Sequence, residues 1–182
     1  MNKLAVVVLL ALGLGVLACG TSPSTSNNVT TTTNGNWEAQ LTGGSQQTSL
    51  MNFVVTFSVT YTTGGTNEPL DVTAFSILNS GSCFAVGKNT NSVSGNATLD
   101  TAADGQVTGE FNMTITSGDG SNSLNLTGNL TGTSNGTTTN AGTLSNGVVA
   151  GSWQFVKQGS ACTGNPSGQF VMCQGAATCT VP

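Results

Sequence analysis

The chain has 182 residues, of which only 5% are charged, and its formal net charge is −4. It holds 3 Lys or Arg residues and no His. Because no basic patch can neutralise phosphates, we expect no binding to nucleic acid, and without an imidazole the chain lacks the usual proton shuttle of catalysis near neutral pH. A chain of this length fits one domain around one core.

Residues 1–18 have the pattern of an export signal. Lys3 precedes an uninterrupted run of apolar residues and Gly from Leu4 to Leu17. This run is too short to cross a hydrocarbon core of ~30 Å as a stable helix. The segment therefore predicts a cleaved signal helix and not a membrane-spanning anchor.

The end of this segment, Val16-Leu17-Ala18-Cys19, resembles the lipobox of bacterial lipoproteins. The resemblance implies that Cys19 is acylated and becomes the new N-terminus, which would attach the protein to a membrane of the cell envelope. Gly20 stands where many inner-membrane lipoproteins of diderm bacteria carry Asp, so the resemblance implies the outer membrane. The alternative is an ordinary signal peptide, in which Cys19 has no such role.

Residues 19–35 predict a flexible tether. They are Ser, Thr, Asn and Gly in the main, and Val29 is their one aliphatic side chain beyond the lipobox. Such a segment cannot bury enough apolar surface to offset the entropy of ordering its backbone. As a random coil it would hold the folded domain, residues 36–182, roughly 20 Å from the lipid.

The segment from Met51 to Tyr61 has the clearest alternation of apolar and polar residues in the chain. Because side chains alternate across a strand with a period of two, it predicts a long strand with one apolar face. The same pattern, at lower contrast, predicts further strands over 37–41, 70–78, 83–86, 93–99, 107–116, 124–130, 149–155 and 169–173.

Turn dipeptides separate these segments and predict an antiparallel all-β meander of eight to ten strands. Hairpin turns are expected at Asp104-Gly105, Asp119-Gly120, Asn135-Gly136 and Asn146-Gly147. Long twisted strands tend to curl, and closure removes exposed edges, so we favour a closed barrel. The alternative is a Greek-key β-sandwich, whereas the lack of aromatic girdles argues against a membrane-spanning barrel.

The start of the domain, Gly35-Asn36-Trp37, resembles the Gly-x-Trp motif of lipocalins and related calycin barrels, in which the Trp plugs the closed end. The whole domain resembles small uncharacterised bacterial lipoproteins with such a start. The residues that carry this wider likeness are Cys83, Gly151-Ser152-Trp153, Cys162-Thr163-Gly164 and Gly168-Gln169-Phe170. The resemblance implies a lipocalin-like barrel and supplies no particular activity.

Four cysteines remain when Cys19 is set aside, and an even number in an exported chain predicts two disulfides. Cys173 and Cys179 enclose a short loop, which leaves Cys83 to pair with Cys162. The alternative pairs Cys162 with Cys173 and Cys83 with Cys179. Zinc would need closer thiolates or His ligands, so we expect no metal and no cofactor.

Candidate catalytic groups are limited to carboxylates. Glu68 with Asp71, and Asp100 with Asp104, could pair as the acids of glycosidases do. All four are next to turn residues, where Asp is favoured by local hydrogen bonds to the backbone, so we expect no enzyme. We interpret the Asn-x-Thr triplets as by-products of composition; they include those that begin at Asn96, Asn112, Asn125, Asn129 and Asn135.

Two functions remain, and they differ in what the inside of the barrel does. The first is a binding module that takes a small neutral or apolar ligand into the barrel mouth. The second is a structural or interaction lipoprotein with a filled barrel, whose Thr-rich outer face contacts envelope polymers or a protein partner. The residues that would line the ligand site or fill the core are Trp37, Phe53, Phe57, Tyr61, Phe111, Trp153 and Phe155.

Overall fold

The computed structural model describes residues 28–33, 36–43, 49–62, 67–88, 91–102, 104–135, 142–175 and 179. Among these residues, no helix is long and apolar enough to cross a membrane. The signal segment 1–18 and the lipidation residue Cys19 lie outside the described residues, so both stay predictions.

All regular elements of the described chain are strands, and they form one sheet. Three of them, β4, β6 and β8, are only two residues long, which is why the count exceeds the eight to ten that alternation predicts. The strands are β1 (Asn28–Thr33), β2 (Trp37–Gly43), β3 (Ser49–Thr62), β4 (Glu68–Pro69), β5 (Asp71–Asn79), β6 (Gly87–Lys88), β7 (Asn91–Ala97), β8 (Asp100–Thr101), β9 (Gln106–Ser117), β10 (Ser123–Ser134), β11 (Thr143–Lys157) and β12 (Ser167–Gln174).

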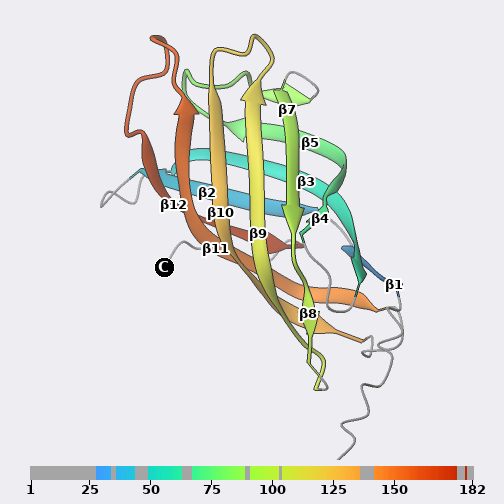
Figure 1. The fold of residues 1–182 in the computed structure, drawn as a ribbon. Coiled ribbons are helices and arrows are strands. Elements are labelled where there is room, and N and C mark those ends of the chain that lie inside the picture. Colours follow the sequence, from blue (N-terminus) through green and yellow to red (C-terminus); the bar gives the residue numbers. More distant parts are fainter. Residues whose placement is uncertain are drawn as a thin grey trace, which may run out of the picture.

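The sheet is an antiparallel meander curled into a nearly closed barrel. Neighbouring strands follow the chain through β7, β9, β10, β11 and β12 and through β2, β3 and β5, and β12 pairs with β2. Figure 1 shows the two groups crossing, with β7, β9 and β10 in front of β2, β3 and β5. The sequential order confirms the predicted all-β meander and differs from the Greek-key alternative.

The remaining opening lies between β5 and β7, and β4 narrows it. Glu68 of β4 pairs with Ala97 of β7, and the Leu70 N–H donates to the carbonyl of Gly95 at 2.9 Å. The chain then turns away into β5, which pairs with β3. One continuous segment therefore links both edges of the curled sheet.

Residues 28–33 differ from the predicted tether, because they form strand β1. This strand pairs antiparallel with the end of β3, from Asn28 opposite Thr62 to Thr32 opposite Ser58, and its last two residues pair parallel with β11. The segment is rich in Thr, whose branched side chain suits a pleated strand. Low hydrophobicity favours disorder in an isolated segment, but an adjacent unpaired strand edge supplies hydrogen-bond partners.

The predicted hairpin at Asn146-Gly147 is wrong, because both residues lie inside β11. Between Thr131 and Thr133 of β10 the register of β11 shifts by one residue, so the dipeptide forms a β-bulge. Asn146 has a φ of 54°, a left-handed conformation that Asn tolerates in bulges as well as in hairpin turns. The predicted turn at Asp119-Gly120 does join β9 to β10, and that at Asp104-Gly105 joins β8 to β9.

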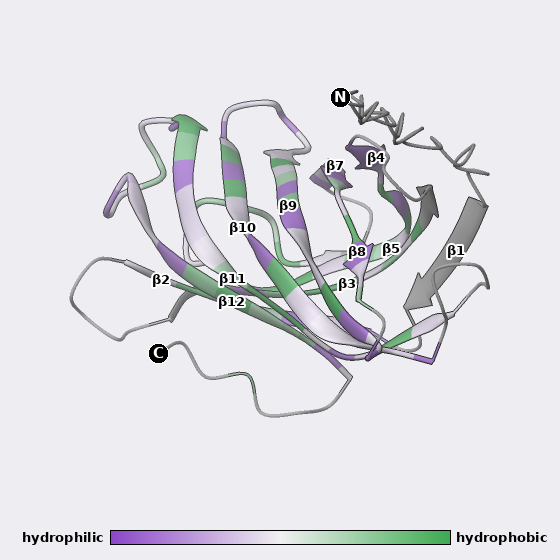
Figure 2. Cartoon of the chain, turned by 60° about the horizontal axis from the view of Figure 1, so that its bottom comes forward, coloured by the Kyte–Doolittle hydropathy of each residue, from purple (hydrophilic) through white to green (hydrophobic). Residues whose placement is uncertain are grey.

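Apolar side chains from every long strand with described side chains point inward and form one core. Green and purple bands alternate along β9 and β10 in Figure 2, as expected for strands with one buried face. The buried inward residues of these two strands are Val107, Phe111, Met113, Ile115, Leu124, Leu126 and Leu130.

Both favoured disulfides are present, Cys83–Cys162 and Cys173–Cys179. The first closes one end of the barrel together with Asn122, which is buried in the β9–β10 turn. The Asn122 side chain donates from Nδ2 to the carbonyl of Cys83 at 2.6 Å and accepts from the Gly159 N–H at 2.8 Å. A covalent link and a buried amide thus join three loops at this end.

Candidate functional site

The predicted aromatic residues occupy the inside of the barrel. Trp37, Phe53, Phe57, Phe111 and Trp153 are 0–3% exposed. Phe155 is partly buried and packs against the same core. Tyr61 lies in β3, but its side chain is outside the described residues.

Phe53 packs against Phe75 with a centroid separation of 5.3 Å, and the other rings pack on one another in two groups. At one end, Trp37 stacks on Phe57 with a centroid separation of 5.4 Å, and Phe57 contacts Phe111 at 5.9 Å. Towards the Cys83–Cys162 end, Phe155 lies between Trp153, at 5.7 Å, and Phe84, at 6.2 Å. Ring contacts at these distances are those of a packed core.

The two tryptophans differ in how their indole N–H is satisfied. Trp153 donates from Nε1 to the carbonyl of Thr42 at 2.9 Å. Gly168 makes this possible, since a Cβ there would lie 2.7 Å from Trp153 Nε1 and 1.8 Å from the Thr42 oxygen. By contrast, Trp37 is 0% exposed and its Nε1 has no hydrogen-bond partner.

Three of the four candidate acids, Glu68, Asp71 and Asp100, lie on the strands β4, β5 and β8, and Asp104 lies in the turn between β8 and β9. Asp104 accepts a hydrogen bond from the Gln106 N–H at 3.1 Å, which is the local turn contact expected of it. Within the described chain, no group of three His, Cys, Asp or Glu residues could hold a metal ion.

Asp119 is held ionised by its own turn. The Ser117 hydroxyl donates to Asp119 Oδ1 at 2.6 Å, and the N–H and hydroxyl of Ser121 donate to the same oxygen at 2.9 and 2.8 Å. These hydrogen bonds, that of Ser117 first, lower the pKa of Asp119 from 3.8 to about 2. The carboxylate therefore fastens the β9–β10 turn.

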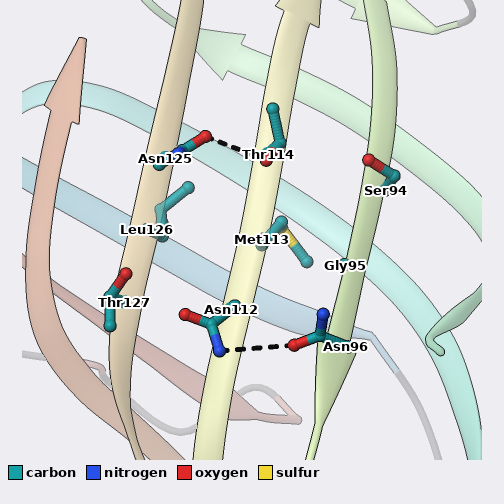
Figure 3. Close-up of a pocket in the computed structure, with 9 residues that line it drawn as sticks. All are labelled: Ser94, Gly95, Asn96, Asn112, Met113, Thr114, Asn125, Leu126 and Thr127. Carbon is teal, nitrogen blue, oxygen red and sulfur yellow. Dashed lines mark hydrogen bonds between the residues drawn. The ribbon is translucent and has the colours of Figure 1, made fainter. Parts of the chain in front are cut away.

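Two adjoining hollows lie on the outer face of β7, β9 and β10. We call the first, of about 270 Å³, the amide furrow (Figure 3); it is lined by Ser94, Gly95, Asn96, Asn112, Met113, Thr114, Asn125, Leu126 and Thr127. The second, of about 580 Å³, continues along β9 and β10 past the end of β7 and is lined by Thr98, Leu99, Asp100, Thr108, Gly109, Glu110, Asn129, Leu130 and Thr131.

The strand register turns the amide furrow into an ordered array. Two successive rows of paired residues, which we call ranks, run across β7, β9, β10 and β11. Each rank contains four uncharged polar side chains. The ranks are Ser94, Thr114, Asn125 and Gln154, and then Asn96, Asn112, Thr127 and Ser152. With strands about 4.8 Å apart, each rank spans roughly 14 Å.

The sequence pattern alone does not single out the amide residues of this face. The chain has six Asn-x-Thr triplets, and four of them, at Asn96, Asn112, Asn125 and Asn129, lie on β7, β9 and β10 or begin there, with their Asn on the outer face. A period of two puts Asn and Thr of one triplet on the same side of a strand. Repetition of the triplet in strands was the available signal, but only the register shows which triplets are neighbours.

A comparison of the chain with protein-family models, with curated proteins and with solved structures finds no match. Its own structure places it among all-β proteins with a nearly closed antiparallel barrel. The lipocalin and lipoprotein resemblances stay predictions from sequence motifs.

Proposed function

We propose that this protein is a non-enzymatic, lipid-anchored interaction protein of the cell envelope, in which a filled barrel supports an outer polar face that contacts an envelope polymer. The packed interior is the observation that carries the proposal, because Trp37, Phe53, Phe57, Phe111 and Trp153 are 0–3% exposed. Such a core suits a rigid support better than a ligand chamber. The two outer hollows give the support a surface on which a polymer can lie.

The envelope location rests on two independent features. The Val16-Leu17-Ala18-Cys19 motif resembles a lipobox, and the disulfides Cys83–Cys162 and Cys173–Cys179 suit an oxidising compartment. The non-enzymatic character rests on the absence of His from the chain and on the turn position of Asp104.

A second candidate function is binding of a small neutral ligand inside the barrel, and Trp37 favours it. Its buried indole N–H has no acceptor, and leaving such a donor unpaired costs about 1–3 kcal/mol. A ligand with a carbonyl or hydroxyl oxygen could satisfy it, provided that the Trp37 and Phe57 rings, stacked at 5.4 Å, separate.

Labelling and co-sedimentation test the first proposal. The full chain should incorporate labelled fatty acid, Cys19→Ser should abolish the labelling, and both forms should co-sediment with polysaccharide isolated from bacterial envelopes. Labelling that persists in Cys19→Ser would contradict the anchor. Failure of both forms to co-sediment with any envelope polymer would contradict the polymer contact.

A further inference from the structure

We infer that the amide furrow binds a segment of a neutral polysaccharide, whose hydroxyl groups pair with Asn96, Asn112 and Asn125. This inference rests on the proposed function and deepens it, since it names the polymer class and the residues. Neighbouring strands use only part of the hydrogen-bonding capacity of these three side-chain amides.

Each of the three amides uses one of its atoms on a neighbouring strand. Asn112 donates from Nδ2 to Asn96 Oδ1 at 3.3 Å, and the Thr114 hydroxyl donates to Asn125 Oδ1 at 2.9 Å. Figure 3 shows these two contacts and the remaining amide atoms of Asn96, Asn112 and Asn125. Two donors, Asn96 Nδ2 and Asn125 Nδ2, and one acceptor, Asn112 Oδ1, are left, which matches the dual donor and acceptor character of a sugar hydroxyl.

The charge of the surroundings selects a neutral polymer. No residue that lines the furrow is charged, so an anionic polymer would find no cation and a cationic polymer no carboxylate. On one side the next rank carries Glu110 opposite Asn129. On the other side Lys157 of β11 pairs with Ser123, and its Nζ donates to the carbonyl of Gly120. Both charges therefore lie outside the two ranks.

The side chains of the array also select a hydroxyl-rich partner over an apolar ligand or a protein. Protein interfaces depend on buried aromatic, Met and Arg anchors, and pockets for small apolar ligands are enclosed and apolar. The two ranks instead present the hydroxyls of Ser94, Thr114, Thr127 and Ser152 and the amides of Asn and Gln. An array about 14 Å wide suits an extended chain of repeating polar units better than one small molecule.

The test is affinity electrophoresis of the full chain in native gels that contain dextran, mannan or xylan, with polygalacturonate as the anionic comparison. The wild type should be retarded by at least one neutral polysaccharide and not by polygalacturonate. Asn112→Ala/Asn125→Ala should weaken that binding about tenfold or more, since two neutral hydrogen bonds are removed. Gln40→Ala, which removes an amide from the outer face of β2, is the control and should bind as the wild type does.

Four outcomes would overturn the inference. Equal retardation of the wild type and the double variant would place the polymer contact elsewhere and leave the proposed function standing. Retardation by polygalacturonate alone would refute the neutral class. Equal loss of binding in Gln40→Ala would show that binding does not depend on the amide furrow in particular and would refute the site. Retardation by none of these polysaccharides, while the chain still co-sediments with another envelope polymer, would refute the inference and not the proposed function.

Discussion

The inner and outer faces of β9 and β10 are made by alternate residues of the same segments, yet their side chains are held by different interactions. Inside, Phe111, Met113 and Leu126 are 0–1% exposed. Outside, Asn112 and Asn125 make hydrogen bonds to side chains of neighbouring strands. A slip of one residue would exchange the two faces, so the apolar side fixes the register. The outer amides are not part of the apolar core, so we expect stability to depend little on them.

The largest expected loss of stability comes from the covalent link at the closed end. Cys83 and Cys162 are 79 residues apart, and chain entropy assigns such a link about 4.5 kcal/mol. Cys83→Ser/Cys162→Ser should lose about that much unfolding free energy in chemical denaturation. Cys173→Ser/Cys179→Ser, with a separation of 6, should lose only about 2.4 kcal/mol. A larger loss of unfolding free energy in Cys173→Ser/Cys179→Ser than in Cys83→Ser/Cys162→Ser would contradict the role of the long-range disulfide.

The contrast between the faces can be measured within the single strand β9. Phe111→Ala should lose about 3–5 kcal/mol, because it removes a fully buried ring from a filled core. Thr108→Ala, which changes an exposed residue of the same strand, should change the unfolding free energy by less than about 0.5 kcal/mol. Denaturation curves that gave both variants similar losses would mean that the inner face is assigned wrongly.

The two tryptophans provide a matched pair within the inner face. Trp153→Phe leaves the carbonyl of Thr42 without its donor, whereas Trp37→Phe removes an N–H that has no partner. We expect Trp153→Phe to be less stable than Trp37→Phe by about 1–3 kcal/mol, the range for an orphaned buried polar group. Equal losses would show that the hydrogen bond of Trp153 contributes nothing beyond packing.

On the outer face, Asn112→Ala/Asn125→Ala should reduce stability by no more than about 1 kcal/mol, because both residues are only partly buried. Thermal unfolding measured beside polysaccharide binding checks this prediction. A loss of unfolding free energy as large as that of Phe111→Ala would mean that Asn112 and Asn125 are part of the structural framework.

The smallest expected effect is the loss of the Asp119 turn contacts at low pH. The lowered pKa of Asp119, about 2, means that its support of the β9–β10 turn is complete above its unfolded pKa of 3.8 and is lost as the pH falls through about 2. An NMR titration of the Asp119 carboxyl should have its midpoint near 2. Ser117→Ala should raise that midpoint, and a wild-type midpoint near 3.8 would refute the turn contacts.

Local patterns in the sequence predicted most of the barrel and none of its long-range register. Alternation places Phe53 and Phe111 inside, because that property depends only on residue spacing. The β1 strand depends on an unpaired edge of β3, and the bulge at Asn146 depends on its partner strand β10. The neighbouring positions of Asn96 and Asn112 likewise follow from pairing between β7 and β9, which no local pattern contains.

If the protein's own side chains fill the barrel interior, no ligand can enter it, and a fluorescence titration can measure this. Trp37 and Trp153, the two tryptophans of the chain, should report any ligand that enters the core. We predict that a fatty acid, a sterol and a neutral aromatic probe, each added to the full chain, leave its tryptophan emission without a saturable change. A saturable change at one ligand per chain that disappears in Trp37→Phe would contradict the filled barrel and establish the interior as a binding site.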